Sequence, residues 1–422
     1  MSESLTIKNI VRMGEDNKSL DQVIKKVSDS LDTMLSYSQR NDYAGFNKYD
    51  ALASPILWPL SFGNKYLRLL YSQTIARSPL NLRPLFAIPR TRNPKGIALF
   101  AMTYLNLYQA RKSEKYLQKA EELLEWLIQN QSTGFPGNSW GYQYPWQDVG
   151  FFAPPNFPNR VVSYFVGTAF LNAYEITGKS LYLDYAIGVK EFLIKAPKVL
   201  YESDKMKCLS YVPDESINWV VMDVSALCGA FCARIAHITN DKSLIEEARK
   251  LIGYVVDKQT DYSAWFYTHP PTANRLKMHD NYHTGYILDA ILDYTDFSGD
   301  DSFRENYHRG LQYYLENLFL TDGTPKWMNN KIYPIDVHGS AQGIITFLKA
   351  GRFDRQYEDF AYRIAEWAID NMQNKDEGYF YYQKGKFFKR PFTIMHWSNG
   401  WMAKAMSEII RKYYAESRSA TN

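Results

Sequence analysis

Hydrophobic positions along the chain follow two different helical patterns. In some segments nearly every position is apolar or small, as in RVVSYFVGTAFLNAYEIT at 160–177. In others the apolar residues recur every three or four positions among charged ones, as in YLQKAEELLEWLIQNQ at 116–131. Helices that are apolar nearly all round are buried, whereas helices with a single apolar stripe lie at a surface. The pattern therefore predicts a set of inner helices and a set of outer helices.

Six inner helices are predicted, at about 95–111, 160–177, 217–239, 279–296, 335–350 and 394–411. An outer helix follows each of the first five, at about 113–130, 180–196, 242–258, 301–318 and 354–373. The last inner helix has no outer partner after it, and an N-terminal helix at about 18–37 could supply one by packing back against it. Six inner and six outer helices whose ends meet form an all-α (α/α)6 toroid, with the N-terminal helix closing the ring.

The chain contains no linker long or polar enough to divide it into two units. Strand signals are limited to short aromatic segments such as GYFYYQKGKFFKR at 378–390. We therefore expect residues 1–422 to form a single toroid domain, in which 38–94 is an N-terminal excursion of loops and one extra helix.

Loops rich in glycine and aromatic residues join each outer helix to the next inner helix, as in STGFPGNSWGYQYPWQD at 132–148. These loops and the first turns of the inner helices therefore lie at one mouth of the toroid. Polar residues in those first turns would face the central cavity and converge from consecutive repeats. They are Asn218 and Asp223, then Asp280, Asn281 and His283, then Asp336 and His338, and finally His396, Trp397 and Asn399.

Asp280 and His283 are candidates for proton transfer. They are three residues apart and so share one face of a helix. A carboxylate in that position can orient an imidazole and raise its basicity. The alternative is that Asp280 only caps the helix, which stabilises it by roughly 1 kcal/mol. The recurrence of Asp and His at 336 and 338, and of His396, slightly favours a catalytic role for these residues.

Aromatic residues make up 16% of the chain, and many lie in the loops at the mouth. Tyrosine and tryptophan combine an apolar face with a polar group, so they often line sugar-binding grooves. The candidates are Trp140, Tyr142, Trp146, Trp265, Tyr267, Trp327, Tyr379 and Tyr381. The alternative is that several of them close over the core. Two further carboxylates, Asp50 and Asp148, stand beside aromatic residues and could act as an acid or a base, or could hold a loop.

Prolines recur every five residues in ARSPLNLRPLFAIPRTRNPKG at 76–96, which excludes a regular helix there. Arg83, Arg90 and Arg92 are interleaved with them and could clamp a carboxylate or a sulfate. The alternative is an exposed basic loop.

Metal-binding spacings occur at His279 and His283 and at Cys228 and Cys232, but no third ligand has a fixed spacing. We therefore expect no metal and no cofactor. The net charge of +4 is too balanced for a nucleic-acid-binding protein. Three cysteines, no N-terminal signal pattern and no apolar run of about 18 residues indicate a cytoplasmic protein without a membrane span.

The helices, loops and polar first turns resemble those of the α/α-toroid carbohydrate enzymes, such as unsaturated glucuronyl hydrolases, N-acylglucosamine 2-epimerases and uronate polysaccharide lyases. Segments such as YDALASP, SPLNLRP, RNPKG, DNYHTGYILD, DGTPKW and YPIDVHGSAQGIITF resemble an uncharacterised family from bacterial and archaeal exopolysaccharide biosynthesis clusters. This resemblance implies a role in making or trimming a polysaccharide, and it assigns no catalytic residue.

The leading hypothesis is an enzyme that cleaves a glycan containing uronic acid or amino sugar, as a hydrolase or a lyase. A hydrolase would use two carboxylates from among Asp50, Asp148, Asp280 and Asp336. A lyase would instead abstract a proton with His283 and either His338 or His396. One alternative is a sugar or uronate epimerase that uses the same histidines. Another is a non-catalytic glycan-binding component of a polysaccharide assembly system.

Overall fold

The computed structural model describes residues 19–273 and 278–419, and the described part is predominantly helical. The inner helices are α5 (Pro94–Arg111), α7 (Arg160–Thr177), α9 (Met222–Thr239), α11 (Asn281–Ser298), α13 (Val337–Ala350) and α15 (Asn399–Ser419). The outer helices are α2 (Leu20–Arg40), α6 (Glu114–Gln129), α8 (Ser180–Lys195), α10 (Lys242–Asp257), α12 (Arg304–Leu318) and α14 (Arg355–Met372). The predicted all-α fold class is confirmed.

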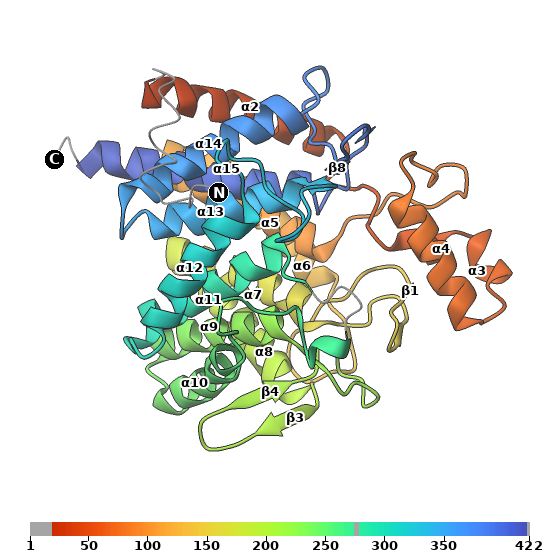
Figure 1. Cartoon of the computed structure of the whole chain (residues 1–422), viewed down its shortest axis with the longest axis horizontal. Helices are drawn as coiled ribbons and strands as arrows, with labels where there is room; N and C mark the ends of the chain where they lie inside the picture. Colours follow the sequence, from red (N-terminus) through yellow and green to blue (C-terminus); the bar gives the residue numbers. More distant parts are fainter. Residues whose placement is uncertain (1–18, 274–277, 420–422) are drawn as a thin grey trace.

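The inner helices contact one another in a cyclic order. Each packs against the next along the chain, and α15 packs against α5. Each of α6, α8, α10, α12 and α14 packs against the inner helix before it, and α2 packs against α15 (Figure 1). The N-terminal helix therefore covers the last inner helix, although the two are separated by most of the chain.

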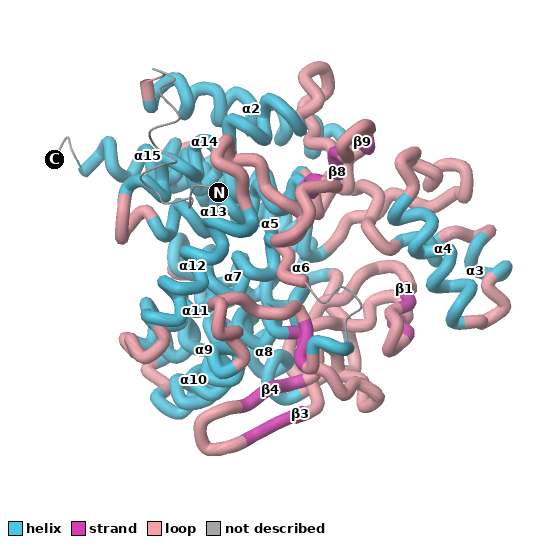
Figure 2. The backbone as a smooth tube through the Cα atoms, viewed as in Figure 1, coloured by secondary structure: helices cyan, strands magenta, loops and turns pink. Residues whose placement is uncertain are grey.

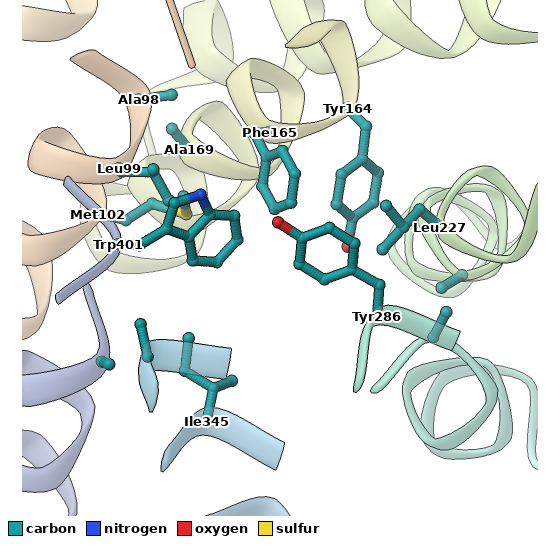
Figure 3. Packing of buried hydrophobic residues seen from close by; sticks show 14 of the residues in the cluster. Ala98, Leu99, Met102, Tyr164, Phe165, Ala169, Leu227, Tyr286, Ile345 and Trp401 are labelled. Atoms are coloured by element: carbon teal, nitrogen blue, oxygen red, sulfur yellow. The ribbon is translucent and has the colours of Figure 1, made fainter. Parts of the chain in front are cut away.

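Burial follows the two sequence patterns. Helix α5 buries nearly every position from Pro94 to Leu107, whereas α6 buries only Ala120, Leu123, Leu124 and Leu127. Side chains fill the centre of the inner ring, where the Phe165 and Trp401 rings meet edge to face at 5.0 Å (Figure 3). Tyr286 packs against both rings. The open central cavity expected from the topology is thus closed at this level by aromatic packing.

Short strands occur in the loops that join the outer helices to the inner helices (Figure 2). The antiparallel pairs are β1 (Trp146–Gln147) with β2 (Phe152–Ala153), β3 (Val199–Glu202) with β4 (Lys207–Leu209), and β5 (Val220–Val221) with β6 (Thr268–His269). A three-stranded sheet has the order β7 (Ile335–Asp336), β8 (Gln383–Lys384), β9 (Lys389–Arg390), with Asp336 opposite Gln383. This sheet joins the start of α13 to the loop before α15.

Between α2 and α5 the chain forms the short helix η1 (Asp50–Ala53), then α3 (Leu57–Leu60) and α4 (Lys65–Arg77). Helices α3 and α4 project from the ring on the side of β1 and β8 (Figure 1). A small separate cluster of buried side chains, which includes Phe46, Leu57, Ile75 and Ile88, holds this excursion together.

Candidate active site

Asp280 and His283 form a hydrogen-bonded pair at the start of α11. The Oδ1 atom of Asp280 accepts the backbone N–H of His283 at 3.0 Å, and its Oδ2 atom lies 2.8 Å from the His283 Nδ1 atom. The two side chains keep 14% and 20% of their area exposed, so the pair is accessible to solvent. Nδ1 is occupied by the carboxylate, whereas Nε2 has no hydrogen-bond partner among the residues that the structure describes.

Two tyrosine rings flank the His283 imidazole. The ring centres of Tyr267 and Tyr282 each lie 4.2 Å from it. Burial lowers the pKa of His283, but the carboxylates of Asp280 and Asp223 more than offset this, so that the pKa is raised. The arrangement gives an oriented imidazole of increased basicity, as a general base requires.

Asp223 is the second carboxylate of the site. It lies in the first turn of α9 and is buried, and its Oδ1 atom has no hydrogen-bond partner among the described residues. Burial raises the pKa of Asp223 to about 6, and the charge of Asp280 adds to this while that of His283 opposes it. Asp223 therefore holds a proton far more readily than an ordinary carboxyl, which makes it a candidate proton donor.

Two lysines approach the same site across the ring of Trp397. The Nζ atom of Lys48 lies 3.8 Å from the ring centre, and that of Lys95 lies 5.2 Å from it. Within the described part of the chain, neither ammonium group forms an ion pair or a hydrogen bond. Such cations beside a partly exposed base could hold the carboxylate of an anionic substrate.

The two lysines differ in their electrostatic environment. Burial lowers the pKa of Lys95 to about 7, and the charge of Lys48 contributes. Burial also lowers the pKa of Lys48, but nearby tyrosine hydroxyls and the carboxylates of Asp336 and Asp280 raise it on balance. Lys48 is therefore a permanent cation at neutral pH, whereas Lys95 changes its charge near neutrality.

Asp336 accepts three hydrogen bonds beside these groups. Its Oδ1 atom accepts the Trp397 Nε1–H at 2.9 Å and the backbone N–H of His338 at 3.1 Å. Its Oδ2 atom accepts from the Gln383 side chain at 2.8 Å. We expected Asp336 to be an acid or a base, but it is 5% exposed and both its oxygens are occupied. It positions Trp397 instead.

His338 is fully buried between aromatic rings, 4.5 Å from both Tyr282 and Trp401. Its Nε2 atom lies 2.7 Å from the hydroxyl of Tyr286. Burial, with the charges of nearby lysines, lowers the pKa of His338 well below its ordinary value. This neutral imidazole supports the Tyr282 ring and is not accessible as a base.

His396 is also buried, and burial lowers its pKa well below the ordinary value. Its Nδ1 atom has no hydrogen-bond partner among the described residues. A Cβ atom on Gly96 would lie 2.6 Å from the Cβ atom of His396, so this glycine allows α5 to approach closely. The centre of the Tyr142 ring lies 6.5 Å from that of His396.

Trp140 and Trp265, expected to bind sugar, belong to the core. The Nε1–H of Trp140 donates to the Leu127 carbonyl at 2.8 Å, and that of Trp265 donates to the Val255 carbonyl at 2.9 Å. Each carbonyl lies two residues before the end of its outer helix. Each carbonyl also accepts the backbone N–H of the residue after the helix, Asn130 or Lys258, at 3.2 Å. The two tryptophans thus make the same additional hydrogen bond at the end of an outer helix in two repeats.

Asn281 and Asn399 are buried, and each side chain links the first residue of its helix to another segment. The Asn281 side chain donates to the carbonyl of Leu318, the last residue of α12, at 2.8 Å. The Oδ1 atom of Asn399 accepts the backbone N–H of Phe380 at 2.9 Å. Asn281 thus joins the start of α11 to the end of α12, and Asn399 joins the start of α15 to the loop before it, so their polar atoms are not available to a substrate.

Asp50 and Arg83 form an ion pair with both side chains 1% exposed, and the Arg83 Nε atom lies 2.8 Å from Oδ1. They therefore hold the excursion together and do not reach the mouth.

Arg92 binds Asp42 and packs over Trp126 on the outer side.

Arg90 is exposed and lies with Tyr379 in a separate cleft of about 210 Å³. Its guanidinium stacks 5.2 Å from the centre of the Phe46 ring. Arg83 lies 5.9 Å from the centre of the same ring, but Arg83 and Arg92 are each paired with an aspartate, so the three arginines do not share one set of partners.

The aromatic loop at 132–148 contributes one accessible ring. Tyr142 is half-buried and stacks on Tyr144, with ring centres 5.4 Å apart. Trp146 is buried against Tyr142. Asp148 accepts the backbone N–H of Gly150 at 3.0 Å and holds a turn, while burial raises its pKa. Trp327, in another loop, is half-buried and outside this group.

Lys48 and Tyr282 were not predicted as site residues, and Asp223 was placed among the polar first-turn residues without a catalytic role. The position of Asp223 in the first turn of an inner helix was sufficient to include it. Lys48 lies in an irregular loop before η1, and no local pattern identifies it.

The spacings suited to metal binding do not assemble a site. The Nδ1 atom of His279 lies 2.7 Å from the Trp265 carbonyl, and its Nε2 atom lies 3.1 Å from the Tyr262 hydroxyl. Cys228 and Cys232 are buried in the core. Among the described residues, no three histidine, cysteine or acidic side chains form a metal-binding group. No described helix is both long enough and apolar enough to traverse a bilayer.

No protein-family model and no curated protein sequence matches the chain. Solved structures of α/α-toroid carbohydrate-active enzymes do match it. An unsaturated glucuronyl hydrolase from Streptococcus agalactiae has a TM-score of 0.62 and 10% identity, with 97% of this chain and 96% of that one covered. A GH76 α-mannanase from Bacteroides thetaiotaomicron has a TM-score of 0.60 and 11% identity, covering 80% and 90%. Cellobiose 2-epimerase from Bacillus thermoamylovorans has a TM-score of 0.57 and 14% identity, covering 75% and 88%.

Proposed function

We propose that the protein is an enzyme that cleaves a glycan containing uronic acid by elimination, with His283 as the base. The observation that carries this proposal is the accessible Asp280–His283 pair beside two cations that have no counter-ion among the described residues. A base and a carboxylate-binding cation are the two requirements for removing a proton from the carbon next to a carboxylate.

The elimination can be written with the groups of this site. The Nε2 atom of His283 takes the proton from C5 of the uronate while Lys48 and Lys95 stabilise the negative charge that develops on the carboxylate. The C5 electron pair forms the C4–C5 double bond, and the C4–O4 bond breaks. The leaving O4 takes a proton, for which Asp223 is the donor, because its pKa of about 6 leaves a substantial protonated fraction near neutrality. No metal ion enters these steps.

The toroid neighbours support a carbohydrate substrate, and the streptococcal neighbour, which matches over nearly the whole chain, is named for a glucuronyl group. A role in exopolysaccharide synthesis or trimming, which the sequence resemblance implies, is consistent with an enzyme that acts on a uronate polymer. Tyr142, Tyr267 and Tyr282 would provide ring faces for the sugars.

Epimerisation of a sugar is the second candidate, and His396 is the observation that favours it. Its buried Nδ1 atom has no described partner and could receive a proton on a second face of the sugar. Its strongly lowered pKa makes it a weak base, which is why we place elimination first.

The test is to incubate the protein with oligouronates and follow the ultraviolet absorbance of the new double bond, reducing ends and solvent deuterium in the sugar. Elimination gives absorbance and reducing ends together, hydrolysis gives reducing ends alone, and epimerisation gives deuterium without cleavage. We expect His283→Gln to lower kcat by about 10²–10⁴-fold. The exposed His308 on α12 provides the matched control, His308→Gln.

Loss of absorbance growth in His283→Gln with an unchanged His308→Gln supports the proposal. Full activity of His283→Gln contradicts the assigned base. Binding of oligouronates without any of the three chemical changes indicates a glycan-binding protein instead.

A further inference from the structure

The projecting hairpin formed by α3 and α4, residues 55–77, exposes an unusual number of large apolar side chains. Phe62 is 82% exposed and Tyr66 is 77% exposed. The exposed set on this hairpin is Ile56, Trp58, Leu60, Phe62, Tyr66 and Leu70. Single exposed apolar residues are ordinary, but a contiguous group of this kind marks an interaction surface.

Helix α4 has two distinct faces. Tyr66 and Leu70 are four residues apart, and Arg77 follows seven residues later, so all three lie on the exposed face. Ile75 and Ala76 lie on the opposite face and are buried. The hairpin packs against the rest of the protein through the buried face of α4, so the exposed apolar residues on the other face do not contribute to that packing.

The hairpin is held in a defined shape that presents Phe62 at its tip. The hydroxyl of Tyr71 donates to the carbonyl of Leu60 at 3.1 Å and ties α4 to α3. Phe62 has a φ of 47°, in the left-handed region that bulky residues rarely adopt. Such a conformation at an exposed phenylalanine is costly, and residues held this way are concentrated at functional sites.

The charge of the hairpin has a single sign. From residue 51 to residue 113 the chain contains no aspartate or glutamate. Lys65 and Arg77 are exposed beside the apolar residues, and the Arg68 guanidinium lies 4.7 Å from the centre of the Trp58 ring. Asp148, half-buried at the base, is the carboxylate that interacts with Lys65.

This combination limits the occupant of the surface. A symmetric dimer through the hairpin would bring the same positive charges together, which disfavours a second copy of the chain. A glycan would account for the aromatic rings and the basic groups but not for the aliphatic side chains of Ile56, Leu60 and Leu70. An anionic lipid surface accounts for both the apolar and the basic side chains, because the former enter the interface and the latter meet the headgroups.

We propose that the α3–α4 hairpin docks the protein onto the surface of an anionic phospholipid bilayer, with Phe62 and Tyr66 entering the headgroup region. The hairpin projects from the mouth side of the ring, so docking would hold the Asp280–His283 site near the membrane (Figure 1). This docking does not depend on the reaction proposed above.

The test is co-sedimentation of the full chain with phosphatidylcholine vesicles, with and without phosphatidylglycerol. We expect binding that requires phosphatidylglycerol and falls at about 1 M salt, where the Debye length is about 3 Å. The double variant Phe62→Ser, Tyr66→Ser should bind at least tenfold more weakly. The matched control is Phe387→Ser, since Phe387 is 88% exposed in another turn and also lies beside lysines.

Binding that is lost in the hairpin variant and retained in Phe387→Ser supports the proposal. Absence of binding to vesicles with phosphatidylglycerol overturns it, as does equal binding by the hairpin variant and the wild type. A dimer seen by light scattering in the wild type but not in the hairpin variant would assign the surface to self-association and also overturn it. Circular dichroism checks that the variants remain folded.

Discussion

Both oxygens of Asp280 act on His283, one through the backbone and one through the imidazole. The carboxylate caps helix α11 with Oδ1 at 3.0 Å and orients the His283 ring with Oδ2 at 2.8 Å. Capping and acid–base chemistry are therefore compatible roles for the same side chain. The geometry leaves Nε2 as the nitrogen available for proton transfer, because Nδ1 is occupied.

Replacing Asp280 by asparagine should lower the pKa of His283 while largely keeping the cap, since asparagine caps helices about as well as aspartate. Asp280 contributes to a raised pKa in the folded protein, where the ordinary value is 6.5. Its stabilising contribution is therefore present below pH 6.5 and lost as the pH rises through the raised value. NMR titration of the His283 ring measures the shift. An unchanged pKa in Asp280→Asn would contradict the pairing.

Lys95 should make stability and uronate binding depend on pH in opposite directions. Its pKa is lowered from 10.5 to about 7 in the folded protein, so relative to Lys95→Met the wild type gains stability as the pH rises from 7 to 10.5. The gain is at most about 5 kcal/mol. Urea unfolding of both proteins across this range measures it.

Binding of a uronate should weaken as the pH rises through about 7, because Lys95 loses its charge there. Calorimetric titration at pH values on either side measures the change in Kd. In Lys95→Met this part of the pH dependence should disappear, while the pH dependence from His283 remains.

The buried pair of Asp50 and Arg83 should be important for stability and not for substrate binding. Arg83→Met leaves a buried carboxylate without its partner, which costs about 3–5 kcal/mol. The double variant Asp50→Asn, Arg83→Met should lose less than the sum of the two single changes. Chemical denaturation measures the free energies. The more exposed pair of Arg92 and Asp42 provides the comparison, where Arg92→Met should cost less than about 1 kcal/mol.

Trp140→Phe and Trp265→Phe should have similar effects, since each removes one hydrogen bond to the end of an outer helix. Each carbonyl keeps one donor, the backbone N–H of Asn130 or Lys258, so we expect a cost of about 0.5–1.5 kcal/mol in the free energy of unfolding. Thermal and urea unfolding measure both. If one change were silent and the other severe, the two tryptophans would not be equivalent parts of a repeat.

The loss of Asp336 should disturb the site through Trp397. Asp336→Ala leaves three buried donors without an acceptor, at a cost of about 3 kcal/mol or more. Asp336→Asn keeps one acceptor oxygen and should cost less. Fluorescence measures the loss of the Trp397 hydrogen bond. Asp336→Asn should change the tryptophan emission of the wild type, and the same change made in Trp397→Phe should have no such effect.

Several features were determined by the sequence alone. Whether a helix is inner or outer follows from its own hydrophobic pattern, because burial of a helix face depends on spacing over a few turns. The starts of α5, α7, α11 and α13 were predicted to within two residues, and Asp280 and Asp336 cap α11 and α13 through atoms only two or three positions away. Helices α9 and α15 begin five residues later than the predicted 217 and 394. The all-helical class followed from these local signals.

The tertiary structure alone decided which polar residues reach the mouth. Asp280, Asn281 and Asp336 all lie at the start of an inner helix, yet only Asp280 forms a pair with a histidine that is partly exposed to solvent. The carboxylate of Asp336 instead accepts hydrogen bonds from Trp397 and Gln383, which belong to a distant segment. Lys48 joins the site from an irregular loop through contact with Trp397, some 350 positions away in sequence by the numbering of the chain. Local pattern specifies the burial of each helix face, whereas the partner of each polar atom depends on contacts between segments far apart in the chain.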